Sequence, residues 1–196
     1  MAISRFAASR LTQGLPKYQS AWDQDNVQQG AMVPIATVVG TGASATALTL
    51  SNIPQIYQDL RLVVSGGLAS SEGLILVTFN NNYTTDLSGT RMNSNGSATA
   101  STRNSGGQTV DLGVAGTFAT GGFMCTVDIS NYTSTAKFKS MIVKMSSDLN
   151  GSGNVALTAA VHRSTSALTS FQFNTATGVA FQPGTTATLY GIKASA

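Results

Sequence analysis

Hydrophobic and polar residues alternate with a period of two along most of the chain after residue 33. Every second residue from Phe123 to Ile129 is apolar, and the same holds from Val155 to Val161. This period is typical of β-strands whose two faces meet different surroundings. We predict strands at 35–39, 45–50, 59–65, 74–79, 109–114, 123–129, 138–145, 155–162, 168–173 and 187–192.

Turn-forming residues separate the predicted strands. Clusters of Asn, Gly and Ser occur at 80–82, 104–107 and 150–153, and these residue types favour tight turns. Ten short strands without a convincing helix predict an all-β protein, a jelly-roll-like β-sandwich formed by residues 34–196. A closed β-barrel is the alternative. Residues 1–33 lack this pattern and are predicted to form an extended N-terminal arm.

The composition agrees with a compact β-protein. Hydrophobic residues make up 42% of the 196 residues and the net charge is only +3, so the chain has enough apolar surface to collapse and little self-repulsion. Only 10% of the residues are charged, which disfavours a helical bundle. The length is sufficient for a core without disulfides.

The arm combines positive charge with scattered apolar and aromatic side chains. Three cations precede the first acid, Asp23, and a loose helical stripe of apolar residues ends at Gly14 and Pro16. Because large aromatic residues and Arg dominate interface energies, we predict that the arm docks on a partner; a disordered tail is the alternative. The predicted contact residues are Arg5, Phe6, Arg10, Leu11, Lys17, Tyr18 and Trp22.

Charge and hydropathy argue against two classes of partner. From Asp23 onward eight Lys and Arg balance eight Asp and Glu, and three cations in the arm are too few for strong binding to nucleic acid. No apolar run reaches the roughly 18 residues of a membrane span, and residues 1–20 lack the apolar run of a signal peptide. We expect no nucleic acid, no membrane, and synthesis in a cytoplasm.

The predicted strand 74–79 is apolar on both faces. An isolated sandwich that exposes one face of each sheet to solvent would not need this pattern. The candidates for self-association are therefore Leu74, Ile75, Leu76 and Val77. The strand is either covered by long loops or buried against an identical subunit, as in homotrimers that pack around a three-fold axis. The second interpretation predicts a homotrimer.

After the arm, the longest stretch without apolar alternation is 83–108. Ser, Thr, Asn and Gly dominate it, and we expect an irregular loop. Loops of this length are usually either functional or disordered, and the pattern does not decide between the two.

Candidate chemistry is sparse. One cysteine, Cys125, and one histidine, His162, cannot supply a four-ligand zinc site. No Gly-x-Ser-x-Gly elbow accompanies His162, which we expect at an exposed strand end. The acids, including the only glutamate, Glu72, are too scattered to nominate a catalytic pair. We predict no enzyme activity, no metal and no cofactor.

Several blocks of the chain resemble virion structural proteins of tailed bacteriophages, especially those of cyanobacterial hosts. The blocks are LSNIPQIYQDL at 50–60, DISNY at 128–132, FKS at 138–140, HRSTSALTS at 162–170 and GTTATLYGIK at 184–193. This resemblance implies a β-sandwich module of head decoration proteins, head fibres or tail fibres. His162 stands where the resemblance implies an aromatic residue such as Trp.

Together, these observations predict a structural protein that is assembled in the host cytoplasm and located in the virion. We expect a capsid decoration protein, of cement or head-fibre type, whose arm binds a major capsid or tail protein. The alternative is a tail-fibre or baseplate-attached protein that recognises a glycan on the host surface. A shallow groove lined by aromatic and acidic residues would favour the second function.

Overall fold

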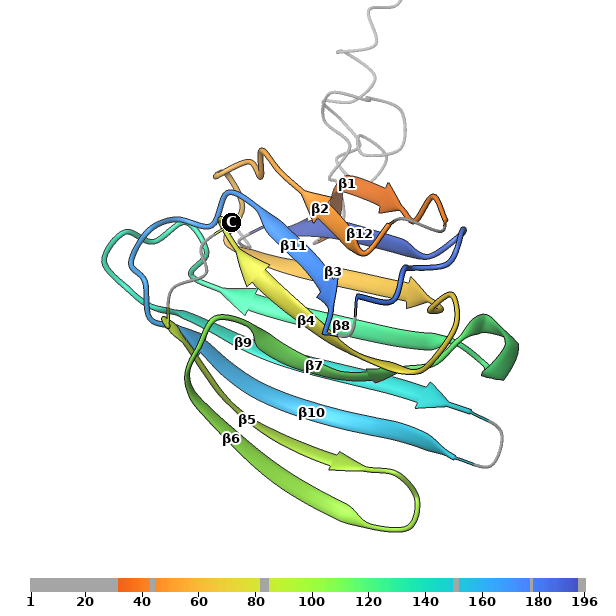
Figure 1. Ribbon diagram of the computed structural model, residues 1–196. Coiled ribbons are helices and arrows are strands. Elements are labelled where there is room, and N and C mark those ends of the chain that lie inside the picture. The colour runs from red at the N-terminus through yellow and green to blue at the C-terminus, as the bar shows by residue number, and fades with distance from the viewer. Residues whose placement is uncertain (1–31, 43–44, 82–84, 150–151, 177, 194–196) are drawn as a thin grey trace, which may run out of the picture.

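The computed structural model describes residues 32–42, 45–81, 85–149, 152–176 and 178–193 (Figure 1). Two antiparallel sheets lie face to face in these residues. The prediction of an all-β sandwich is confirmed. The alternative of a closed barrel is wrong, because the strands divide into two separate sheets.

The larger sheet has eight strands and the smaller one has four. In spatial order, the larger sheet contains β1 (Met32–Val39), β12 (Thr186–Ile192), β3 (Asp59–Gly66), β8 (Phe123–Ser130), β9 (Lys139–Asp148), β10 (Gly153–His162), β5 (Leu87–Ser94) and β6 (Thr99–Gly107). The smaller sheet contains β2 (Ala47–Leu50), β11 (Phe171–Thr175), β4 (Gly73–Phe79) and β7 (Val110–Ala115). A 3-10 turn, η1 (Phe118–Thr120), lies between β7 and β8.

The strand pairing is that of a jelly roll with two inserted hairpins. Strand β1 pairs with β12, β2 with β11, β3 with β8 and β4 with β7, so the pairings are nested and the chain crosses repeatedly between the sheets. The hairpins β5–β6 and β9–β10 are inserted into this series. They extend the larger sheet beyond the four strands of the jelly roll.

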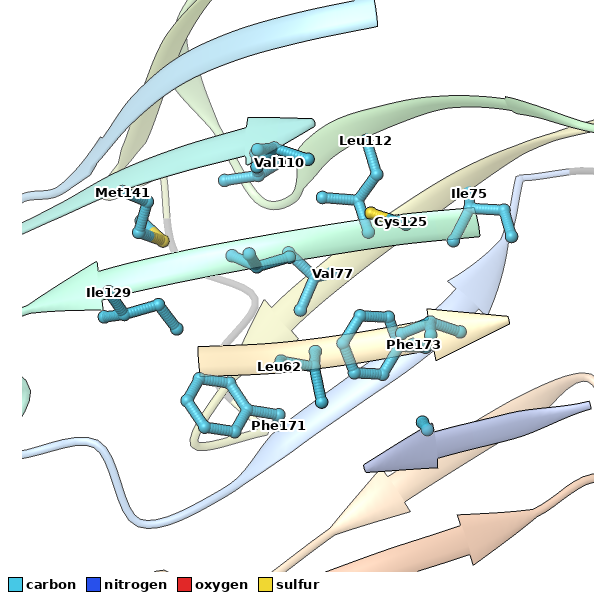
Figure 2. Close-up of a cluster of buried hydrophobic side chains, with 14 of the residues drawn as sticks. Leu62, Ile75, Val77, Val110, Leu112, Cys125, Ile129, Met141, Phe171 and Phe173 are labelled. Atoms are coloured by element: carbon cyan, nitrogen blue, oxygen red, sulfur yellow. The ribbon is translucent and has the colours of Figure 1, made fainter. Parts of the chain in front are cut away.

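The core lies between the two sheets (Figure 2). Large aliphatic and aromatic side chains from alternate positions of both sheets meet there, and burying each one stabilises the fold by about 1.5–3 kcal/mol. The larger sheet contributes Leu62, Cys125, Ile129 and Met141, and the smaller sheet contributes Ile75, Val77, Val110, Leu112, Phe171 and Phe173.

The segment 83–108 is not an irregular loop as predicted. Its described residues form the hairpin β5–β6. The turn is held by Asn95, whose Oδ1 accepts hydrogen bonds from the backbone amides of Ser97 and Ala98, and Gly96 supplies a positive φ of 88°. Thr, which is β-branched, favours extended backbone. The hairpin buries little apolar surface, and for this reason it shows no apolar alternation.

The first strand begins earlier than predicted. Strand β1 starts at Met32, so Met32 and Val33 belong to the sandwich and not to the arm. Val33 is buried in the described structure. Pro34 is accommodated because β1 lies at the edge of its sheet, where a missing amide donor removes no essential bond, and the register shifts between Pro34 and Ala36.

Candidate interaction surface

The outward side of the eight-stranded sheet, called the outer face below, carries an unusual number of apolar side chains. Five large apolar residues at outward positions are between 42% and 64% exposed. An antiparallel sheet normally directs polar residues to solvent on this side. These five residues form the apolar cluster: Met92 on β5, Met124 on β8, Ile142 on β9, and Val155 and Leu157 on β10.

Strand pairing brings the members of the apolar cluster together. Leu157 is opposite Met92 on one side and Lys144 on the other. Two shallow depressions connect the cluster, because Met92 and Met124 each line a depression that Val155 and Leu157 also line. Four of the five members are therefore joined across β5, β10 and β8, with the exposed Lys144 of β9 between them. Ile142 lies two residues from Lys144 on β9 and lines the neighbouring hollow.

The alternation from Val155 to Val161 thus marks the outer face. The opposite face of β10 presents Ala156, Thr158, Ala160 and His162 to the interior. Strand β7 packs closely on this face: a Cβ on Gly113 would lie 3.3 Å from Ala156 Cβ. The inward residue at position 156 is an alanine because the space between β10 and β7 admits nothing larger there.

A shallow hollow of about 600 Å³ adjoins the apolar cluster on the same face. Its lining reaches from Ile192 on β12 to Arg103 on β6 and contains no aromatic residue. Ser130, Ser140 and Ala159 contribute small side chains. The hollow is thus a wide, mildly polar depression and not a deep pocket.

A bidentate ion pair lies in the hollow. Arg61 Nε donates to Asp128 Oδ1 at 2.5 Å, and Arg61 Nη2 donates to Oδ2 at 3.1 Å. The contact with Asp128 raises the pKa of Arg61 above its ordinary value. Arg61 Nη1 also lies 3.9 Å from Met32 Sδ. The described chain therefore begins at the rim of the hollow, on the outer face.

Two titratable side chains are buried at the end of the sandwich where β9 begins and β10 ends. Lys139 is fully buried, and its ammonium donates to the backbone oxygens of Ser134, Ser164 and Lys137 at 2.7, 3.1 and 3.4 Å. Burial lowers the pKa of Lys139. The three carbonyls solvate the charge and connect the loop before β9 to the loop after β10.

His162 is not at an exposed strand end as predicted. It is 3% exposed, and its ring lies 5.4 Å from that of Phe79. Burial lowers the pKa of His162, and Lys139 lowers it further, while Asp86 has the opposite effect. Within the described residues, Nδ1 of His162 has no hydrogen-bond partner. This environment favours a neutral imidazole with a packing role, in the position where the resemblance implies an aromatic residue.

A polar pocket of about 110 Å³ lies under the hairpin β5–β6. Arg91 forms an ion pair with Asp111 of β7 there, and Thr158 Oγ1 donates to the backbone oxygen of Asp111. Arg103 also lines the pocket, and its Nη1 donates to Thr90 Oγ1 at 3.1 Å. The ion pair attaches the hairpin to β7.

Other candidate chemistry can be placed in the same described ranges. Burial raises the pKa of the Cys125 thiol to about 12, and at neutral pH the thiol is protonated and weakly reactive. No group of three His, Cys, Asp or Glu side chains in the described part of the chain could hold a metal ion. The same part contains no helix long and apolar enough to cross a membrane.

The predicted contact residues of the arm, from Arg5 to Trp22, lie outside the described residues. The four residues predicted for self-association divide between two environments. Ile75 and Val77 are 1% exposed and face the core, so they are not available to another subunit. Leu74 and Leu76 are half-buried on the opposite side of β4 and are accessible to another subunit.

No protein family, curated protein or solved structure was found to match the chain. Sequence reasoning missed the apolar cluster, because exposure on a sheet face depends on which side the second sheet covers. The sequence shows that Val155 and Leu157 share one face of β10, but a more apolar face is ordinarily expected to point inward.

Proposed function

We propose that the protein is a non-enzymatic structural protein of a virion surface, specifically a capsid decoration protein whose N-terminal arm binds a major capsid or tail protein. The observation that carries the proposal is a jelly-roll sandwich of two antiparallel sheets. The sequence blocks that resemble virion proteins of tailed bacteriophages support it. A low charge density and short Ser- and Thr-rich side chains also suit a protein that coats a particle.

The alternative function is host recognition by a tail-fibre or baseplate-attached protein. Glycan sites on proteins commonly stack sugar rings on aromatic side chains. The hollow on the outer face contains the acids Asp59 and Asp128 but no aromatic residue among those that line it. This lining favours attachment over glycan binding. Counting copies per particle separates the two, because many copies over the head indicate decoration and a few at one vertex indicate a fibre.

The proposed assembly is a homotrimer formed through the sandwich. We expect light scattering of the full-length protein at micromolar concentration to give three times the chain mass of 20.1 kDa. Leu76→Asp is expected to reduce this mass, because Leu76 is half-buried on the outward side of β4. Leu157→Asp on the other sheet is the matched control and should leave the mass unchanged. A monomeric wild-type protein would refute the trimer.

The proposed anchor is the arm. A protein that lacks residues 1–30 is expected to fold, as circular dichroism would verify, but to lose incorporation into particles that lack the native protein. In the full-length protein, Trp22→Ala is expected to reduce incorporation more than Lys17→Ala, because a buried aromatic contact commonly contributes about 2 kcal/mol or more while rim charges mainly alter association rate. Equal incorporation of the truncated and full-length proteins would place the anchor in the sandwich.

A further inference from the structure

The apolar cluster on the outer face requires an explanation, because exposed apolar patches of this kind usually mark a contact. We propose that the segment 18–25 of the chain's own arm docks on the outer face, with Trp22 over the apolar cluster and Asp23 against Lys144. The inference rests on the proposed function only in treating the arm as a docking segment. It assigns the aromatic half of the arm to the protein's own sheet.

The position where the described chain begins supports this occupant. Met32 lies on the outer face, with its sulfur 3.9 Å from Arg61 in the wall of the hollow. Leu157 is five strands away from β1 in the sheet order, and from strand spacing and rise per residue the distance from Met32 is about 27 Å. Trp22 precedes Met32 by ten residues, which span at most about 33 Å. Trp22 can therefore reach Leu157.

Charge complementarity supports the same occupant. Lys144 is exposed in the middle of the apolar cluster, and neither ion pair of the described residues, Arg61–Asp128 or Arg91–Asp111, includes it. Asp23 directly follows Trp22, and Asp25 is two residues further along. A segment that places the indole on Leu157 therefore brings a carboxylate within reach of the Lys144 ammonium.

The shape of the surface favours an inserted segment over a second copy of the same face. Two hollowed faces placed against each other would leave a large void between them, which costs dispersion energy. A single extended segment can follow the depressions on either side of Val155. The short connection to Met32 also gives the segment a high effective concentration at its own sheet.

Docking would give the two halves of the arm separate roles. The aromatic residues Tyr18 and Trp22 would cover the apolar cluster, and the basic residues Arg5 and Arg10 would remain for the virion partner. The docked segment would also fix where the basic half leaves the sandwich. If Trp22→Ala reduces incorporation, the reason is then that the segment no longer docks, so that the basic half of the arm does not leave the sandwich at the correct place.

The test uses Trp22 as its own reporter, because it is the only tryptophan. In the isolated full-length protein, its fluorescence emission should lie at shorter wavelength than in the same protein unfolded in denaturant. Leu157→Asp should move the emission of the folded protein to the unfolded value. Ile56→Asp is the matched control: Ile56 is 79% exposed but lies outside the cluster, and this variant should keep the wild-type emission. Circular dichroism verifies that both variants fold.

The charge contact has its own test. Lys144→Glu should shift the emission of Trp22 to longer wavelength, and the double variant Asp23→Lys, Lys144→Glu should restore it. Wild-type emission at the unfolded value, or emission unaffected by Leu157→Asp, would overturn the proposal. Neither result concerns particle incorporation, so the inference can fail while the proposed function stands.

A mixing experiment decides whether the segment docks on its own chain. Leu157→Asp and Trp22→Phe proteins are unfolded and refolded together, so that only the chain with the damaged face carries a tryptophan. Docking on the same chain predicts that the emission stays at the unfolded value. A shift of the emission toward the wild-type value would mean that the arm docks on a second copy, and would overturn the assignment to its own sheet.

Discussion

Replacement of Tyr132 by alanine is expected to lower the free energy of unfolding by about 4 kcal/mol, because deletion of a fully buried aromatic ring removes its packing and leaves a cavity. Tyr132 lies in the loop between β8 and β9 and has no exposed surface. Its hydroxyl donates to the backbone oxygen of Pro54 at 2.5 Å and accepts from the amide of Tyr57 at 3.2 Å. The ring therefore connects this loop to the segment that precedes β3.

Two further variants separate the contributions of the Tyr132 ring and hydroxyl. Tyr132→Phe keeps the ring and should cost about 1–2 kcal/mol, since two hydrogen-bonding groups lose their partner. Tyr190→Ala is the matched control, because Tyr190 is only half-buried on β12, and it should cost clearly less than Tyr132→Ala. Urea denaturation followed by circular dichroism measures all three. Equal losses for Tyr132→Ala and Tyr190→Ala would contradict the assigned role.

Lys139→Met is expected to lower the free energy of unfolding by about 3 kcal/mol, because hydrogen bonds from a charged donor are stronger than neutral ones and three carbonyl groups lose theirs together. Methionine has a similar length and fills the space with an apolar chain, so lost packing contributes little. The loops on either side of β9 and β10 would also lose their common contact.

Lys193→Met provides the matched control for Lys139→Met. Lys193 carries the same charge and is exposed, and exposed substitutions usually change stability by less than about 0.5 kcal/mol. Thermal and urea denaturation should therefore separate the two variants clearly. If both variants are as stable as the wild type, the buried ammonium has no structural role.

Periodicity was sufficient to predict most of the sandwich, because strands such as β8 and β12 bury every second residue against the opposite sheet. It failed for β5 and β6, since β6 is exposed along most of its length and its Thr and Ser residues produce no apolar alternation. Hairpins at the edge of a sheet are difficult to recognise from hydrophobic patterns for this reason.

The candidate surface was less predictable than the fold. The period of β10 indicates which residues share a face, but not which face the smaller sheet covers. Strand β7 lies close to β10, where Gly113 and Ala156 face each other. The larger apolar residues of β10 therefore point outward, although apolar residues of this size are ordinarily expected to point inward. The burial of His162 has the same origin, because its neighbour Phe79 comes from the other sheet and no local pattern identifies it.

The nested strand pairing has a consequence for the order of events during synthesis. Strand β1 pairs with β12, and Met32 is opposite Ile192, so the first strand must wait while about 160 residues are translated, roughly 8–30 s at typical rates. The pairs β4–β7 and β3–β8 enclose shorter stretches of chain and incur a smaller loop-closure cost. The jelly roll is thus expected to close from its inner pairs outward, with the pair β1–β12 formed last.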